Sequence, residues 1–162
     1  MKKKCAILIP ALDPPAEFRD YINHLIHAGF DSVIVVDDGS SDKTIFNDIS
    51  RYPQITVLTH EINYGKGRAL RTGLSFYHSN FSPELYSGVI TVDSDGQHLI
   101  DDVKKLQNCL NSGSQHIILG VRDFNQENVP PKSKFGNKLT SLIFRLFLNL
   151  LSLIHISEPT RP

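Results

Sequence analysis

Residues 88–98 read Gly88-Val89-Ile90-Thr91-Val92-Asp93-Ser94-Asp95-Gly96-Gln97-His98. The first five residues are apolar and rich in β-branched side chains, which predicts a short buried strand. The remaining residues begin with two carboxylates two positions apart and include a glycine that permits a sharp turn. The segment therefore predicts a strand that ends in a loop, with both carboxylates free to face a ligand.

Similar apolar runs alternate with helical spacing along the rest of the chain. The predicted strands are 4–9, 32–36, 55–58, 88–92 and 116–119, and the predicted helices are 16–28, 43–50, 69–78, 101–110 and 136–150. Strict alternation favours an α/β fold with a largely parallel sheet. Strands that are apolar on both faces require helices on both sides of that sheet.

The composition is that of a globular domain. Of the 162 residues 40% are hydrophobic and 21% are charged, and Lys+Arg and Asp+Glu number 17 each. This balance gives no reason to expect a nucleic-acid partner. No stretch reaches the roughly 18–20 apolar residues of a membrane span, and Cys5 and Cys109 form no disulfide or metal-binding pattern.

Three polar clusters, 37–42, 63–68 and 93–98, each follow a predicted strand. Ligands of parallel α/β sheets bind at the carboxyl ends of the strands, so we expect these clusters to form one composite site. Asp93, Asp95 and the amide oxygen of Gln97 offer the hard oxygen ligands that suit Mg²⁺ or Mn²⁺. The alternative for this motif alone is a polar turn that caps a strand.

The other clusters also allow two interpretations. Asp37 and Asp38 can accept hydrogen bonds from a base or a ribose, or they can belong to a turn that caps a helix. Segment 63–68 places two glycines and two cations at a helix start, which favours phosphate, although a solvated helix terminus fits as well. Basic residues further along could neutralise a diphosphate or lie on a solvated surface: Arg122, Lys132, Lys134 and Lys138.

The last segment looks foreign to the rest of the chain. Residues 151–161 match a frame translation of a common transposase-based sequencing adapter. We therefore expect one domain over residues 1–150, incomplete at its C-terminus, and a non-native tail over 151–162. A larger native protein would have continued beyond residue 150.

Taken together, five segments resemble the inverting glycosyltransferase family 2. In the family's order, these are residues 9–13, 35–44, 63–74, 93–98 and 133–139. The resemblance is greatest to the branch of dolichol- or polyprenyl-phosphate sugar synthases. It implies a GT-A (Rossmann-like) fold, a three-layer α/β sandwich with a mostly parallel central sheet.

The resemblance also implies a function. A sugar would pass with inversion from a UDP- or GDP-linked donor to a polyprenyl-phosphate or cell-envelope glycan acceptor. Mg²⁺ or Mn²⁺ would be held by Asp93, Asp95 and Gln97, with Asp93 and Asp95 as the catalytic residues. The implied donor-binding residues are Pro10, Val35, Asp37, Asp38, Lys66, Asp93 and Arg122, with Asp37 on the base and Pro10 and Val35 beside it. The implied location is cytoplasmic, at or near the inner face of a membrane.

Two departures from the family pattern keep alternatives open. Relatives often carry Asn and Glu where this chain has Asp13-Pro14-Pro15, and an acidic-Gln-Gly-aromatic-Arg segment expected after residue 150 is missing. One alternative is a nucleotide-binding fragment that does not catalyse transfer. Another is a sugar-phosphate nucleotidyltransferase, but this would need a glycine-rich basic loop after the first strand, where residues 11–15 stand instead.

Overall fold

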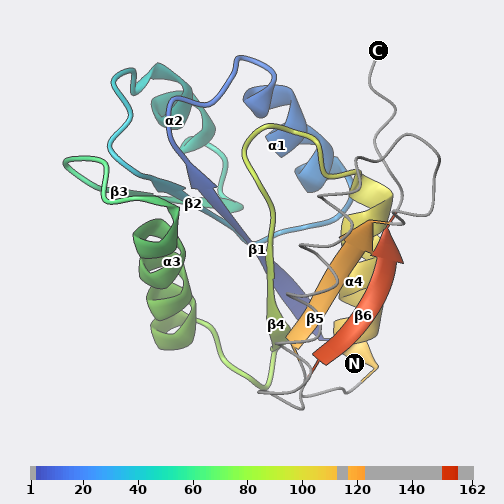
Figure 1. Ribbon diagram of the computed structural model, residues 1–162. Coiled ribbons are helices and arrows are strands. Elements are labelled where there is room, and N and C mark those ends of the chain that lie inside the picture. The colour runs from blue at the N-terminus through green and yellow to red at the C-terminus, as the bar shows by residue number, and fades with distance from the viewer. Residues whose placement is uncertain (1–2, 113–116, 123–150, 157–162) are drawn as a thin grey trace, which may run out of the picture.

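The computed structural model describes residues 3–112, 117–122 and 151–156 (Figure 1). Strands and helices alternate in chain order as the sequence predicts. The elements are β1 (Lys4–Ala11), α1 (Phe18–His27), β2 (Val33–Asp37), α2 (Thr44–Ile49), β3 (Ile55–Thr59), α3 (Lys66–Asn80), β4 (Tyr86–Thr91), α4 (Ile100–Asn111), β5 (Ile117–Arg122) and β6 (Leu151–Ile156).

Four strands form one parallel sheet in the order β3-β2-β1-β4. The central strand β1 is buried from Cys5 to Ala11, because it has a neighbouring strand on each edge and helices on each face. Its side chains alternate between two hydrophobic clusters. Cys5, Ile7 and Ile9 belong to one cluster, and Ala6 and Leu8 belong to the other.

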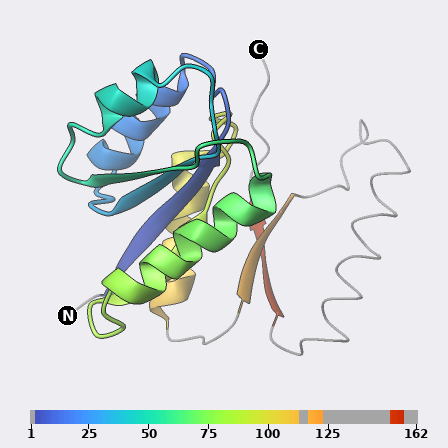
Figure 2. The same ribbon diagram turned by 90° about the vertical axis from the view of Figure 1, so that its left-hand side faces the viewer.

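The helices complete a three-layer sandwich, which confirms the predicted fold class. Helices α1, α2 and α4 supply apolar side chains to the cluster on one face, and α3 covers the other face (Figures 1 and 2). Helix α3 lies close to β1, since a Cβ added at Gly73 would lie 2.1 Å from Leu8 Cδ1. Gly73 thus sets how near α3 lies to the sheet.

The fifth strand does not join this sheet. Strand β5 pairs in parallel with β6, from Ile117 opposite Leu151 to Arg122 opposite Ile156. Figures 1 and 2 show this two-stranded ribbon beside the main sheet, on the side of α4. From the sequence we expect this strand in the same sheet as the other four. An apolar run carries no information about which strand it will pair with.

Strand β6 lies within the tail that the sequence predicts to be foreign. Its sequence, Leu-Ser-Leu-Ile-His-Ile, is rich in the β-branched and apolar residues that favour strands whatever their origin, so the origin of the tail stays a prediction. The sequence predicts a loop over 121–135, but its first two residues belong to β5, because their pairing with β6 extends the strand to Arg122. The rest of that loop and the predicted helix over 136–150 lie outside the described residues, as do Lys132, Lys134 and Lys138.

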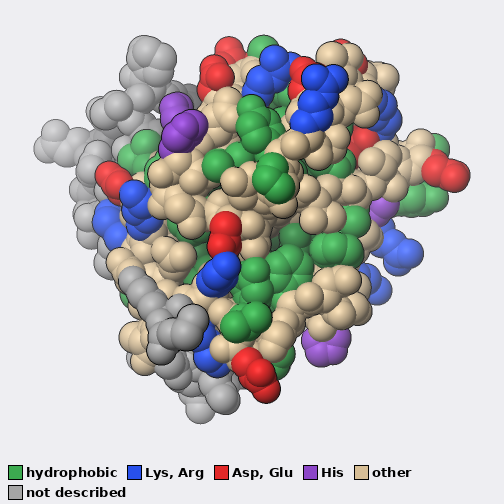
Figure 3. All heavy atoms as spheres, turned by 180° about the vertical axis from the view of Figure 1, so that it is seen from behind, with side chains coloured by type: hydrophobic (Ala, Val, Ile, Leu, Met, Phe, Trp, Pro, Cys, Tyr) green, Lys and Arg blue, Asp and Glu red, His purple; other side chains and the backbone are tan. Residues whose placement is uncertain are grey.

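No helix among the described residues is long and apolar enough to cross a bilayer. On the face of the molecule in Figure 3, acidic and basic side chains are interspersed with hydrophobic ones. This distribution agrees with the equal numbers of acidic and basic residues in the sequence.

Candidate functional site

A cleft of about 380 Å³ opens at the carboxyl ends of the central strands. It is lined by Pro10, Ala11, Leu12, Asp38, Asn63, Gly65, Lys66, Ala69, Asp93, Ser94 and Asp95. The structure therefore brings together members of all three polar clusters that follow strands. The reason is topological, because the strands β1 to β4 are all parallel and end at the same edge of the sheet.

The two carboxylates of the Asp-x-Asp motif both line this cleft. Lys66 Nζ lies 2.6 Å from Asp93 Oδ1, and His98 Nε2 lies 3.8 Å from Asp93 Oδ2. Asp95 Oδ1 accepts a hydrogen bond of 3.0 Å from the backbone N–H of Gln97. Gln97 itself is exposed and is not among the cleft-lining residues.

The chemistry of this donor set fits a divalent cation. Mg²⁺ in proteins is usually bound through one or two carboxylates, with substrate phosphates and water supplying the other ligands. Asp93 and Asp95 supply two carboxylates beside an open cleft. The described residues contain no group of three or more His, Cys, Asp and Glu side chains placed to hold a metal. The site therefore suits a cation that a phosphate ligand would help to hold, rather than a closed protein cage.

Helix α3 begins in the wall of the cleft. It starts at Lys66, three residues earlier than the sequence predicts, because Gly65 adopts a φ of +89° and turns the chain into the helix. Gly65 donates its backbone N–H to Asn63 Oδ1 at 2.9 Å. No side chain caps the first turn, so the positive end of this 15-residue helix faces the cleft beside the Lys66 ammonium group.

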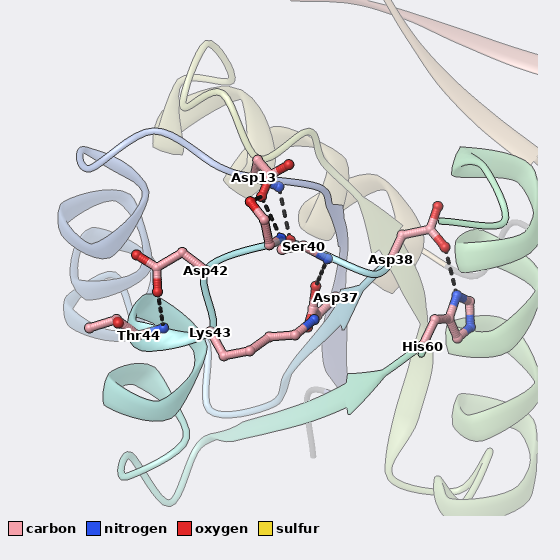
Figure 4. Close-up of polar contacts among 9 residues, drawn as sticks. Asp13, Asp37, Asp38, Ser40, Asp42, Lys43, Thr44 and His60 are labelled. Atoms are coloured by element: carbon pink, nitrogen blue, oxygen red, sulfur yellow. Dashed lines mark hydrogen bonds and ion pairs between the residues drawn. The ribbon is translucent and has the colours of Figure 1, made fainter. Parts of the chain in front are cut away.

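Asp38 is held at the cleft by His60, a residue for which the sequence predicts no role. His60 Nδ1 lies 2.7 Å from Asp38 Oδ1 (Figure 4). On the other side of the ring, His60 Nε2 lies 2.9 Å from Thr72 Oγ1. Tyr64 also donates its backbone N–H to Asp38 Oδ1 at 3.0 Å. Burial raises the pKa of Asp38, but the hydrogen bonds from His60 and Tyr64 outweigh it and leave this pKa below its usual value.

Register explains this contact and could have revealed it. Asp37 at the end of β2 lies opposite Thr59 at the end of β3. The next residues, Asp38 and His60, therefore come side by side. The signal in the sequence is an acid and a histidine that each follow one of two neighbouring parallel strands.

Asp37 and Val35 lie away from the cleft lining. Asp37 is fully buried, its Oδ1 accepts a hydrogen bond from the Ser40 backbone N–H at 2.8 Å, and its Oδ2 pairs with Lys43 Nζ at 2.5 Å (Figure 4). Val35 is fully buried in the cluster under α1 and α2. In this structure Asp37 fixes the loop after β2, whereas Asp38 and Pro10 face the cleft.

The loop after β1 is tied to the loop after β2. Asp13 adopts a φ of +41°, its backbone N–H donates to Ser40 Oγ, and its Oδ1 accepts from both the hydroxyl and the backbone N–H of Ser41 (Figure 4). The hydrogen bond from the Ser41 hydroxyl holds the pKa of Asp13 below its usual value, and the backbone bond adds to it. These bonds fix one wall of the cleft.

Arg122 is the last residue of β5 and pairs in register with Ile156. Its side chain lies outside what the structure describes. Its predicted role in donor binding therefore stays a prediction.

Tyr21 on α1 is buried beneath the Asp-x-Asp loop. Its side chain is 6% exposed, and a Cβ added at Gly96 would lie 4.0 Å from Tyr21 Cβ. Its hydroxyl has no hydrogen-bond partner among the described residues. Burial raises the pKa of Tyr21 far above its usual value, and the negative charges of Asp95 and Asp93 raise it further.

Replacing Tyr21 by Phe is expected to raise the free energy of unfolding by about 1 kcal/mol. The change removes a buried hydroxyl that finds no hydrogen-bond partner in the described part of the chain, and such a group costs about 1–3 kcal/mol. Urea unfolding of wild type and Tyr21→Phe measures the difference. The matched control is Tyr86→Phe, which removes a hydroxyl 2.7 Å from Ser32 Oγ and should lower stability by a similar amount. Equal losses in both variants would mean that the Tyr21 hydroxyl has a partner.

The architecture is that of the GT-A fold, and comparison with solved structures supports this. The crystal structure of glucosyl-3-phosphoglycerate synthase from Mycobacterium tuberculosis in complex with Mn²⁺, UDP and glucosyl-3-phosphoglycerate superposes with a TM-score of 0.64. The match covers 99% of this chain and 73% of the synthase at 18% identity. The same synthase with Mg²⁺ and UDP gives a TM-score of 0.63 at 18% identity. At these identities the likeness establishes the fold.

Residues 6–158 match the glycosyl transferase family 2, and the chain belongs to that family. One relative is the UDP-N-acetylglucosamine--dolichyl-phosphate N-acetylglucosaminyltransferase of Methanococcus voltae, 30% identical over 85% of this chain and 60% of that protein. Another is the dolichyl-phosphate beta-glucosyltransferase ALG5A of Trichomonas vaginalis, 30% identical over 59% of this chain and 29% of that protein. The chain thus spans well under two thirds of the length of these relatives.

Proposed function

We propose that this chain is the donor-binding part of a metal-dependent, inverting glycosyltransferase that uses a nucleotide sugar and a polyprenyl-phosphate acceptor. The observation that carries the proposal is the cleft itself, in which the two carboxylates of the Asp-x-Asp motif, a lysine and the start of helix α3 converge at the sheet edge. A nucleoside diphosphate carries the charge and the oxygens that these groups complement.

Each cleft residue has a part in this proposal. Asp93 and Asp95 would hold Mg²⁺ or Mn²⁺, which when bound would stabilise the charge that develops on the departing diphosphate. Lys66 and the first backbone N–H groups of α3 would bind the diphosphate oxygens. Asp38, oriented by His60 at 2.7 Å, would accept hydrogen bonds from the nucleoside beside Pro10. Asp37 would support this loop from within the core.

The acceptor supplies the oxygen that attacks the sugar. A phosphate monoester is largely ionised at neutral pH, so one of its oxygens can attack without a dedicated base. That oxygen bonds to the anomeric carbon as the bond to the diphosphate oxygen breaks, and the electron pair leaves with the nucleoside diphosphate. Attack opposite the leaving group inverts the anomeric configuration. A glycan hydroxyl as acceptor would require a carboxylate base in addition.

The relatives favour particular reactants. The Methanococcus voltae relative is named for a UDP-linked donor and a dolichyl-phosphate acceptor, so we take a UDP-sugar as the first donor and treat a GDP-sugar as the comparison. A water-soluble donor and a lipid acceptor would meet at a membrane surface. We propose that the reaction takes place at the cytoplasmic face of that membrane.

The proposal is tested by incubating the chain with radiolabelled UDP-N-acetylglucosamine and dolichyl phosphate in detergent, with and without Mn²⁺. Metal-dependent transfer of label into the lipid phase is the expected result, and GDP-mannose in parallel tests the choice of nucleotide. Binding of UDP without transfer would support the alternative of a nucleotide-binding fragment. Absence of both binding and transfer would overturn the proposal.

A further inference from the structure

The ammonium group of Lys66 contacts the Asp93 carboxylate, where a divalent cation would also bind. Its Nζ lies 2.6 Å from Asp93 Oδ1, and the two side chains are 62% and 46% exposed. The lysine begins α3 and the carboxylate follows β4, so the pair joins two separate segments that line the cleft. In this arrangement the ammonium group neutralises the first carboxylate of the Asp-x-Asp motif.

A divalent cation and the Lys66 ammonium group compete for this oxygen. Both are positive, so a cation bound at Asp93 repels an ammonium group in contact with the same carboxylate. The lysine side chain has four carbons and rotatable bonds, and it is largely exposed, so it can move away without disturbing the core. A displaced ammonium group would find a new partner in a phosphate oxygen bound in the same cleft.

We propose that Lys66 is an exchangeable counter-ion. Its ammonium group pairs with Asp93 when no cation is bound there, and it pairs with the diphosphate when a divalent cation binds Asp93. The inference rests on the proposed function of the cleft and adds a mechanism by which cation and diphosphate reinforce each other's binding. Lys66 is in this sense a positioning residue. Lys66 lowers the affinity for the cation when no diphosphate is bound. It raises the affinity for the diphosphate when the cation is bound.

Thermodynamic linkage gives this exchange a measurable signature. UDP raises the affinity for Mn²⁺ by some factor, and Mn²⁺ raises the affinity for UDP by the same factor. If Lys66 changes partners, replacing it must lower that factor. If Lys66 contacted the phosphate equally with and without the cation, its replacement would weaken UDP binding in both cases and leave the factor unchanged.

The test is calorimetric titration of Mn²⁺ into the full chain, with and without saturating UDP, for wild type and Lys66→Met. Methionine keeps the length of the side chain and removes its charge. We expect Mn²⁺ alone to bind about two- to fivefold more tightly to the variant, as for the loss of an exposed ion pair. We expect the factor by which UDP tightens Mn²⁺ binding to fall by about three- to tenfold.

Lys4→Met is the matched control. The Lys4–Asp31 pair has a separation of 2.5 Å and exposures of 55% and 46%, close to those of Lys66 and Asp93. It lies at the start of β1, at the opposite end of the sheet from the cleft. This variant should leave both Mn²⁺ titrations as in wild type. Lys66→Gln repeats the test if the methionine variant does not give a cooperative thermal melt.

The outcomes separate the two proposals. A factor that is the same in wild type and Lys66→Met, with UDP binding weakened, would overturn the exchange and leave the donor site standing. A wild-type chain that binds neither Mn²⁺ nor UDP would overturn the donor site and with it the exchange.

Discussion

Asp95→Ala is expected to abolish the part of UDP binding that depends on Mn²⁺. Asp95 supplies one of the two carboxylates of the Asp-x-Asp motif in the cleft, and a metal site that uses so few protein ligands cannot lose one without a large loss of affinity. We expect the affinity for UDP in the presence of Mn²⁺ to fall by about 100-fold or more, to the level measured without metal. Calorimetric titration of UDP, with and without Mn²⁺, measures the loss.

The control for this prediction is Asp101→Asn. Asp101 is an exposed acid in the first turn of α4 that does not line the cleft. The Asp101→Asn variant removes the same charge from a position close to Asp95 in the sequence. Metal-dependent binding that survives in Asp95→Ala, or is lost equally in Asp101→Asn, would contradict the assignment of the site to the Asp-x-Asp motif.

Gly39→Ala is expected to lower the stability of the fold strongly, because Gly39 packs against the backbone of the loop at residues 62–63. Gly39 adopts a φ of +81°, and a Cβ there would lie 2.3 Å from the Ile62 carbonyl carbon and 2.4 Å from the Asn63 backbone nitrogen. Backbone atoms cannot move aside as a flexible side chain can. We expect a loss of about 3 kcal/mol or more in the free energy of unfolding, measured in urea.

Gly29→Ala separates the two causes of this loss. Gly29 has a φ of +94° but no atom within 4 Å of an added Cβ. This variant should therefore show the conformational cost alone, about 1–2 kcal/mol. If both variants lost the same stability, close packing of the loops at residues 39 and 62–63 would not contribute. Because Asn63 lines the cleft, Gly39→Ala should also weaken UDP binding, whereas Gly29→Ala should not.

The main sheet and its covering helices could be predicted from the sequence for a simple reason. Apolar runs such as 32–36 and 88–92 are too short for helices and apolar on both faces, which leaves a covered parallel strand as the stable arrangement. The edge of the sheet at which Asp38, Lys66 and Asp93 meet follows from the same topology. The grouping of these residues in one cleft could therefore be predicted without knowledge of side-chain conformations.

The partners of individual side chains could not be predicted in the same way. Asp37 and Asp38 are adjacent and chemically identical, yet one is buried against Lys43 and the other lines the cleft. Both residues are buried, and which carboxylate lines the cleft depends on the alternation of the strand and on the bend after it. The contact of Asp38 with His60 depends on the register between β2 and β3. The pairing of β5 with β6 depends on residues far apart in the chain.

The central claim is that a divalent cation on Asp93 and Asp95 holds a nucleoside diphosphate in this cleft. Anomalous diffraction at the manganese edge, from crystals of this chain grown with Mn²⁺ and UDP, tests it most directly. The claim predicts one manganese peak in contact with carboxylate oxygens of Asp93 and Asp95, with the diphosphate of UDP as a further ligand and Lys66 turned away from Asp93. Bound UDP without manganese at these carboxylates, or manganese only elsewhere on the protein, would contradict it.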